Sequence, residues 1–414
     1  MSLRKTVGVV VCLSLSTAML QAQLSEVNSR QDFSTESTEF DFEGPKHGAF
    51  AGDLFSRWGL RFSDGSGGVT TIMTRTELVF TDNSLLNGMG TSSSAGIPLV
   101  IDLKYPAKKI GFDLGNGDEN TPVSVTAFDG LGNNLGSIQR TGLGDPSFLG
   151  VGVAGAGGIS KLMVSYGNSV DAEEIDDLVV EYVDRPEFKT FLAQIANGLI
   201  ENFGTFQTTI IVTNSSNSTA VGELALFDSD GLPLEMDFGD GPKSTLSLEL
   251  PPRSSKTFVS TGTALGVGYA RVQTNVPTDG TAIFRLTLPS GVIASEAGVG
   301  SDAGRVDVVG AVEKVAAEGF DSGIAVVNVS GTQADGEILL YDQSGEEVGR
   351  NRNLLDLPPG EHTSGFLSTI FSELEGEDFS GTIQIASDVP LAVVIMRTVG
   401  GIVISSLPVS SLEK

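Results

Sequence analysis

The side chains available for nucleophilic or zinc chemistry are few in this 414-residue chain. His47 and His362 lie far apart in the sequence, and Cys12, the only cysteine, stands alone in an apolar run. Zinc sites and Ser-His or Cys-His nucleophiles need such side chains in combination. We therefore expect no catalytic residue of these classes, no enzyme activity, and a surface position for each histidine.

Carboxylates near the two ends of the first large block are the strongest candidates for a metal site. Calcium takes several oxygen ligands, and an antiparallel sandwich brings its first and last strands together. Glu43 or Asp41 of FDFEG would then lie near Asp176 and Asp177 of IDDL. Alternation along the strand turns Asp176 toward the core, where an unpaired carboxylate is costly. The pattern predicts a structural calcium ion held by Glu43, Asp176 and Asp177. The alternative is a strand-end aspartate that accepts backbone N–H bonds.

Other acidic segments carry weaker signals. GFDLGNGDEN offers Asp113, Asn116 and Asp118 to a cation, but Gly-Asn-Gly-Asp also forms an ordinary turn. DSDG at Asp228 and DQSG at Asp342 lack the twelve-residue spacing of a calcium loop. We interpret both as turns.

Two patterns belong to enzyme classes. Glycoside hydrolysis needs two carboxylates across a cleft, and the densest acidic cluster is at 173–177, but a chain with 52 acidic residues contains such pairs by chance. The only tryptophan, Trp58, alternates with its neighbours like a buried strand residue. GVGVAG at 150–155 matches a dinucleotide-binding pattern, yet a glycine loop and a strand follow where a helix is required. Neither pattern therefore indicates catalysis.

The N-terminus and the charge indicate export. Arg4 and Lys5 precede an apolar stretch that leads to Ala18 and Ala22, the order of a secretory signal peptide. Cleavage would remove two of the 25 basic side chains and none of the 52 acidic ones, and this balance repels nucleic acid and anionic lipid. Solubility outside the cell is the first interpretation of the charge, and binding of divalent cations is the second. We expect no membrane span and no disulfide in the exported chain.

The second half of the chain contains a repeat. GELALFDSDG begins at Gly222 and GEILLYDQSG at Gly336, and Asn214 and Asn328 precede them at the same offset. LELPPRS and LDLPPGE follow at a shorter offset, so the first copy has additional residues around FGDGPKS, which predict a longer hairpin loop. Apolar alternation interrupted by Gly, Pro, Asn and Asp predicts short antiparallel strands in each copy.

One segment departs from this strand pattern. In FLSTIFSEL, an apolar face follows the candidate cap Ser364. The face consists of Phe366, Ile370, Phe371 and Leu374. We expect a short helix that closes one end of the second repeat.

We expect an all-β chain of five segments. They are a signal peptide at 1–22, a mobile polar segment at 23–39, a sandwich at 40–183, and two sandwich repeats at 186–300 and 301–414. FDFEG, WGLRFS, KKIGFDLGNGD, VTAFDGLGNNLGS, FLGV and EIDDLVVEY resemble the jelly-roll domain of secreted bacterial proteins with PEP-CTERM sorting tails, although this chain ends in PVSSLEK. TTIIVTN, GELALFDSDG, LELPP, GYARVQTN and AIFRL are similar to tandem immunoglobulin-like β-sandwich modules of exported bacterial proteins.

The resemblance implies a fold and a location, and it implies no reaction. We expect a non-catalytic secreted, cell-surface or periplasmic protein whose jelly roll recognises a glycan or a surface and is carried on two spacers. The alternatives are a structural matrix or adhesion component that associates through edge strands, and a polysaccharide hydrolase. The expected partners are an extracellular polysaccharide or another cell-surface protein, with calcium as the one cofactor considered.

Overall fold

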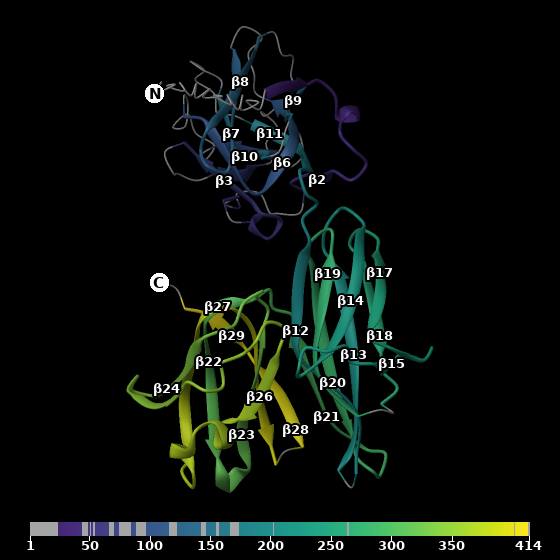
Figure 1. Ribbon diagram of the computed structural model, residues 1–414, viewed down its shortest axis with the longest axis vertical. Helices are drawn as coiled ribbons and strands as arrows, with labels where there is room; N and C mark the ends of the chain where they lie inside the picture. The colour runs from purple at the N-terminus through teal and green to yellow at the C-terminus, as the bar shows by residue number, and fades with distance from the viewer. Residues whose placement is uncertain are drawn as a thin grey trace, which may run out of the picture. The chain divides into compact units, whose positions relative to one another are not determined.

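The structure is a computed structural model, shown in Figure 1. It describes residues 24–43, 49, 51–52, 54–65, 70–73, 84–87, 97–115, 122–141, 146–154, 157–165, 174–201, 203–262, 265–400 and 402–412. The chain divides into two compact units, Met1–Asp184 and Arg185–Lys414. Antiparallel strands make up both units, which confirms the all-β fold. The expected signal peptide lies outside the described residues.

The first unit holds eleven of the described strands. They are β1 (Leu24–Val27), β2 (Thr38–Phe40), β3 (Leu60–Asp64), β4 (Thr70–Met73), β5 (Ser84–Asn87), β6 (Leu99–Gly115), β7 (Val123–Phe128), β8 (Asn134–Arg140), β9 (Ser147–Val153), β10 (Ile159–Ser165) and β11 (Glu174–Tyr182). Two short 3-10 turns, η1 (Arg30–Asp32) and η2 (Ser56–Trp58), accompany them.

The long strand β6 connects the two halves of this unit. Its first half pairs with β3 and β10, and its second half pairs with β9 and β11. Buried side chains from both halves, among them Ile101 and Ile110, join one hydrophobic core. One strand therefore joins both sets of strands into a single eleven-stranded sheet around that core.

The segment at 23–39 differs from the mobile lead-in that we expected. Leu24–Val27 forms β1 and pairs with β9, and Ser29 caps η1 by accepting a hydrogen bond from the N–H of Gln31 at 3.1 Å. Val27 is buried and Leu24 packs against the core. Two apolar side chains in this polar stretch are enough to add a strand to the sheet.

Trp58 is another difference from the sequence analysis. It lies in η2 rather than in a strand, because Gly59 takes a left-handed conformation (φ 76°) and the alternating strand begins only at Leu60. The indole is partly buried and packs edge-to-face on Phe40 with ring centroids 6.3 Å apart.

The second unit contains the two repeats. The first copy has β12 (Phe188–Ile200), β13 (Gly204–Asn214), β14 (Ala220–Asp228), β15 (Met236–Asp237), β16 (Pro242–Lys243), β17 (Thr245–Leu250), β18 (Ser255–Val259), β19 (Gly266–Thr274), β20 (Thr278–Thr287) and β21 (Ile293–Gly300). The second copy has β22 (Arg305–Val315), β23 (Phe320–Asn328), β24 (Gly336–Asp342), β25 (Glu347–Asn351), β26 (His362–Phe366), β27 (Phe379–Val399), β28 (Val403–Leu407) and β29 (Val409–Ser411). A 3-10 turn, η4 (Ala316–Glu318), joins β22 to β23.

The two copies share one strand plan. In the first, β19 pairs with β12 and β14, and β20 pairs with β13 and β21. In the second copy, the single strand β27 takes the positions of both β19 and β20. Its first half pairs with β22 and β24, and its second half pairs with β23 and β28. Pro390 lies between the halves, where a residue without an N–H is tolerated. The additional residues of the first copy form the β15–β16 hairpin, as predicted.

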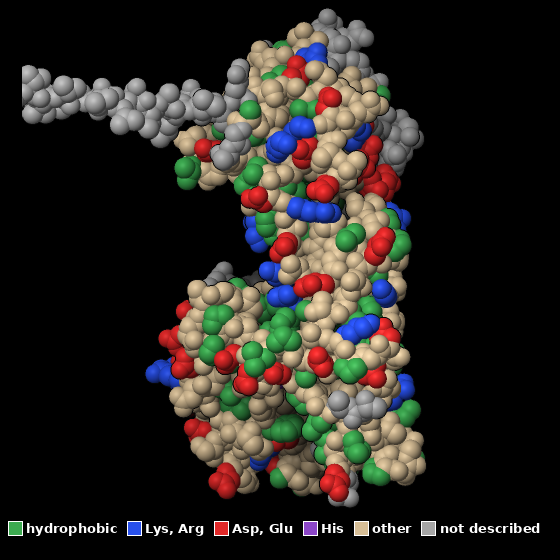
Figure 2. Space-filling model, turned by 45° about the vertical axis from the view of Figure 1, so that its right-hand side comes forward, with side chains coloured by type: hydrophobic (Ala, Val, Ile, Leu, Met, Phe, Trp, Pro, Cys, Tyr) green, Lys and Arg blue, Asp and Glu red, His purple; other side chains and the backbone are tan. Residues whose placement is uncertain are grey.

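The two repeats also share a hydrophobic core. Leu192 and Val212 of the first repeat belong to the same buried cluster as Val327 and Val394 of the second. The connection between the repeats pairs with β12, because Phe191 and Asp302 exchange both backbone hydrogen bonds at 2.8 Å. Hydrophobic side chains are visible along the line where the two repeats meet (Figure 2).

The helical segment is shorter than predicted. It consists of α1 (Leu367–Ile370) followed by the 3-10 turn η5 (Ser372–Leu374), and Ile370, Phe371 and Leu374 are buried in the core of the second repeat, as expected. Ser364 is not the cap, because β26 continues to Phe366, which is the N-cap residue and is 42% exposed. Leu367 takes the buried position instead.

Candidate functional site

The predicted metal residues lie near the place where β2 meets β11, the last strand of the first unit. Strand β2 pairs with β11 through Phe40 and Leu178, as the sequence predicted. Asp176 and Asp177 are on β11, whereas Glu43 follows β2 and is exposed. The backbone N–H of Glu43 donates to Asp41 Oδ1 at 3.2 Å.

Asp176 is buried, as its place in the alternation predicted, with 5% of its surface exposed. Its Oδ1 accepts a hydrogen bond from the backbone N–H of Asp177 at 2.7 Å. Asp177 has a φ of 46°, and the register with β6 shifts between Asp176 and Val179. This bulge matches the alternative that we gave for the motif, an aspartate accepting a backbone N–H bond.

The cation beside these carboxylates is the guanidinium of Arg30. Its Nη2 lies 3.0 Å from Asp113 Oδ2 and 4.0 Å from Asp177 Oδ2, and it donates to the Asp177 carbonyl at 2.6 Å. Burial raises the pKa of Asp177, Arg30 acts to lower it, and the nearby Asp113 and Asp41 raise it further. A calcium ion at Asp177 would therefore compete with Arg30.

Within the described ranges, no group of three or more His, Cys, Asp or Glu side chains is placed to hold a metal ion. Asn116, Asp118, Glu173 and His47 lie outside those ranges. The calcium site at Glu43, Asp176 and Asp177 stays a prediction.

Arg30 also belongs to an aromatic-cation cluster that the sequence analysis missed. Phe33 and Phe148 pack edge-to-face with ring centroids 6.1 Å apart. The Cζ of Arg30 lies 5.2 Å from the centroid of Phe148, and Lys109 Nζ lies 5.8 Å from that of Phe33. Both phenyl rings are partly exposed. We call Arg30, Phe33, Lys109 and Phe148 the aromatic-cation cluster.

Glycine makes room for this cluster on the outer face of the sheet. A Cβ at Gly111 of β6 would lie 2.5 Å from the ring of Phe148 and 3.1 Å from that of Phe33. A Cβ at the paired residue Gly150 of β9 would lie 3.0 Å from the carbonyl oxygen of Val27 and 3.3 Å from the ring of Phe148. The alternating glycines of FLGVGV are the sequence signal that could have indicated a covered strand face.

Glu181 of β11 forms ion pairs with Lys109 of the cluster and with the neighbouring Lys108. Lys108 Nζ lies 3.1 Å from Glu181 Oε1, and Lys109 Nζ lies 3.0 Å from Oε2, which also accepts the N–H of Ser34 at 3.1 Å. Burial acts to raise the pKa of Glu181, but its hydrogen bonds to Lys109, Ser34 and Lys108 lower it overall. The carboxylate is therefore ionised at neutral pH and orients both lysines.

His362 is buried rather than at the surface, so our expectation for it was wrong. It lies between the repeats, where its Nε2 is 3.0 Å from Gln194 Oε1 and its Nδ1 is 3.3 Å from Ser229 Oγ. The ring stacks on Tyr269, whose hydroxyl donates to the carbonyl of Gly360 at 2.8 Å. Burial lowers the pKa of His362 to about 4, although a hydrogen bond with the Ala193 backbone acts in the opposite direction. His362 therefore joins the repeats as a neutral side chain.

The repeated acidic motifs are turns, as predicted. Asp228 Oδ1 accepts the N–H of Asp230 at 3.0 Å and that of Leu232 at 2.8 Å. Asp342 Oδ1 accepts the corresponding N–H groups of Ser344 and Glu346 at 2.8 and 2.9 Å. Strand β10 likewise follows the glycines after residue 153, so GVGVAG does not begin a helix.

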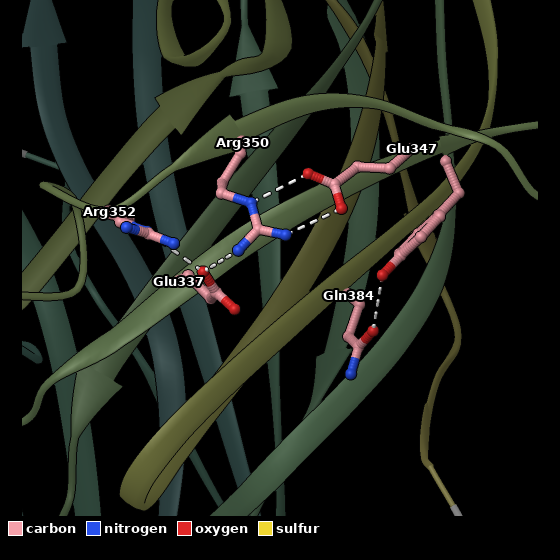
Figure 3. Close-up of polar contacts among 6 residues, drawn as sticks. Glu337, Glu347, Arg350, Arg352 and Gln384 are labelled. Carbon is pink, nitrogen blue, oxygen red and sulfur yellow. Dashed lines mark hydrogen bonds and ion pairs between the residues drawn. The ribbon is translucent and has the colours of Figure 1, made fainter.

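The charged face of the second repeat is a closed ion-pair network (Figure 3). Arg350 binds both oxygens of Glu347 at 2.8 Å and reaches Glu337 Oε2 at 2.6 Å, and Arg352 also approaches Glu337 at 3.3 Å. Tyr341 donates to Gln384 Oε1 at 3.3 Å. In the first repeat, Glu223, which corresponds to Glu337, pairs with Arg271 of the neighbouring strand β19 at 3.2 Å. These groups bind one another across the sheet.

No known family model and no curated protein matches the sequence. Among the described helices, none has the length and apolar character that crossing a bilayer requires.

Proposed function

We propose that the protein is a non-catalytic, exported recognition protein. Its first unit binds an extracellular polysaccharide or another cell-surface component, and its two repeats act together as the carrier. The aromatic-cation cluster is the observation that carries this proposal. The signal-peptide pattern at 1–22 and the excess of acidic side chains support the export.

The aromatic-cation cluster has the chemistry that binds sugars. Phe33 and Phe148 present partly exposed ring surface on a sheet face, and aromatic rings pack against the apolar faces of other molecules. Arg30 and Lys109 place donors over the rings of Phe148 and Phe33. Asp113 and Glu181 fix the positions of these two cations. Rings held beside oriented polar groups are typical of small-molecule and glycan sites.

The two repeats are suited to carry this unit rather than to react. Their repeated Asn and Asp side chains bond to the local backbone, and His362 binds Gln194 and Ser229. Structural calcium held by Glu43, Asp176 and Asp177 belongs to the proposal as a second element. Arg30, which approaches Asp113 and Asp177, would lie beside that ion.

A glycan array tests the proposal, with the full chain applied with and without a chelator. We expect binding by the natural chain, loss of binding in Phe148→Ala and Phe33→Leu, and retention in Phe258→Ala. Phe258 is a matched control because Lys256 Nζ lies 5.3 Å from its ring in the first repeat. Trp58 fluorescence verifies that the first unit is folded. Absence of glycan binding by the natural chain would contradict glycan recognition and favour a matrix or adhesion role.

A further inference from the structure

A cavity of about 460 Å³ lies between the two repeats. None of the residues that line it belongs to the aromatic-cation cluster. Its walls come from β12, β13 and β20 of the first repeat and from β23, β26, α1, β27 and β28 of the second. The volume is within the range typical of sites for drug-sized molecules, about 300–1,000 Å³. The cavity exists only because the repeats pack as one unit.

The lining of the cavity is mainly apolar and carries no charged side chain. Phe206 and Phe284 come from the first repeat, and Ile324, Met396 and Ile404 from the second. No Asp, Glu, Lys or Arg is among the lining side chains, although the chain contains 52 acidic and 25 basic residues. A charged ligand would lose its hydration there without gaining a counter-charge, which is strongly unfavourable.

Gln194 is the one amide among the polar side chains of the lining, and the hydroxyls of Thr369 and Thr398 already donate to the carbonyls of Phe366 and Asp321. The Gln194 side chain is buried, with 9% of its surface exposed, and its Oε1 is held by His362 Nε2 at 3.0 Å. Its Nε2 has only a 3.5 Å contact with the carbonyl of the neighbouring Ile195, which is longer than a normal N–H···O bond. The amide is thus fixed at one end and retains donor capacity at the other. A buried donor of this kind favours a ligand that brings an acceptor.

We propose that the cavity binds an uncharged, mainly apolar small molecule with a carbonyl or hydroxyl oxygen that accepts a hydrogen bond from Gln194. Phe366 lines the cavity and is 42% exposed, so the cavity reaches a residue at the protein surface. This inference does not depend on glycan recognition, because its residues belong to the second unit.

Two uncharged fluorescent probes test the proposal on the full chain. Prodan is a naphthalene with a carbonyl acceptor, and N-phenyl-1-naphthylamine is a similar molecule without one. We expect both to bind in a saturable manner at one site per chain, with enhanced and blue-shifted emission. Ala196→Phe fills the cavity and should weaken both probes by at least about tenfold. Leu232→Phe, at an exposed position outside the cavity, should leave both unchanged.

Gln194→Met separates the hydrogen bond from the apolar lining. It should weaken Prodan by about two- to tenfold and leave N-phenyl-1-naphthylamine within about twofold. Far-UV circular dichroism verifies the fold of each variant. Binding that is absent in the natural chain, or insensitive to Ala196→Phe, would overturn the proposal. If probe binding falls as the chain self-associates, the cavity is the contact site for a second copy of the chain. That result would also overturn the proposal.

Discussion

Asn214 and Asn328 occupy the same position in the two repeats and make the same hydrogen bonds. Each is fully buried, and each Nδ2 donates to the carbonyl of the leucine before the Pro-Pro pair, Leu250 at 3.0 Å and Leu357 at 2.8 Å. Each Oδ1 accepts the hydroxyl of the serine two residues on, at 2.7 Å. The repeated sequence motif therefore forms the same buried hydrogen-bond network in both repeats.

Removing either asparagine network should destabilise its repeat. Asn214→Ala or Asn328→Ala leaves buried backbone carbonyls without donors, and we expect each to lower the free energy of unfolding by about 2–4 kcal/mol. Chemical denaturation followed by far-UV circular dichroism measures the loss. Asn353→Ala is the control, since Asn353 is exposed. Equal free energies of unfolding for Asn328→Ala and Asn353→Ala would show that the asparagine network does not stabilise the repeat.

The glycine that begins each repeated phrase should not tolerate a side chain. A Cβ at Gly222 would lie 1.9 Å from the carbonyl oxygen of Gln273, and a Cβ at Gly336 would lie 2.4 Å from that of Ala386. Because both obstacles are backbone atoms of paired strands, we expect Gly222→Ala to cost more than about 3 kcal/mol or to prevent folding. Gly300→Ala, where no atom lies within 4 Å, should be nearly neutral in the same denaturation assay. A stable Gly222→Ala chain would contradict the strand packing.

The stability of the second unit should depend on pH through His362. Its pKa falls from 6.5 to about 4 on folding, so between these values the unfolded chain binds the proton more readily. Stability is complete above pH 6.5 and declines as the pH falls toward 4, by about 1.4 kcal/mol per pH unit for one proton. His362→Gln removes this proton, so its stability should change less steeply with pH than that of the natural chain. Parallel pH profiles would contradict the role of His362.

Arg30 should control the ionisation of Asp177. Burial and the neighbouring carboxylates already raise the pKa of Asp177, and Arg30 is the group that lowers it. In Arg30→Gln, the pKa of Asp177 should rise further, as followed by the side-chain carboxyl signal in an NMR titration. Arg140→Gln is a matched control, because Arg140 pairs with Glu26 instead. An unchanged pKa would place Asp177 outside the influence of Arg30.

The calcium hypothesis makes a separate prediction. If Glu43, Asp176 and Asp177 hold an ion, a chelator lowers the melting temperature of the first unit, which Trp58 reports because it is the only tryptophan. Asp176→Asn combined with Asp177→Asn should remove this chelator effect. A melting temperature that the chelator does not change would exclude the site.

Much of the fold was readable from local patterns. Alternation predicted the strands, and the offsets of Gly222, Gly336 and the Pro-Pro motifs located the hairpin that distinguishes the copies. The same pattern placed Asp176 inward, because alternation fixes which face a strand residue occupies. These predictions depend on residues that are neighbours in sequence.

The contacts that define the site could not be read in this way. Arg30 meets Asp113 and Asp177, and His362 meets Gln194, across long separations that only the tertiary fold brings together. A single histidine in a β-rich sequence looks the same whether it is exposed or buried between modules. The bulge at Asp177 likewise depends on pairing with β6, which no local motif specifies.

The two repeats form one body with a shared core, and the distance between two spin labels, one on each repeat, shows whether the repeats keep one relative orientation in solution. Cys12→Ser removes the only natural cysteine, and labels are attached through Val221→Cys in the first repeat and Val348→Cys in the second, both at exposed positions. Pulsed electron-electron double resonance should give a single narrow distribution of distances between the two labels. A broad or bimodal distribution would contradict the shared core and the cavity between the repeats.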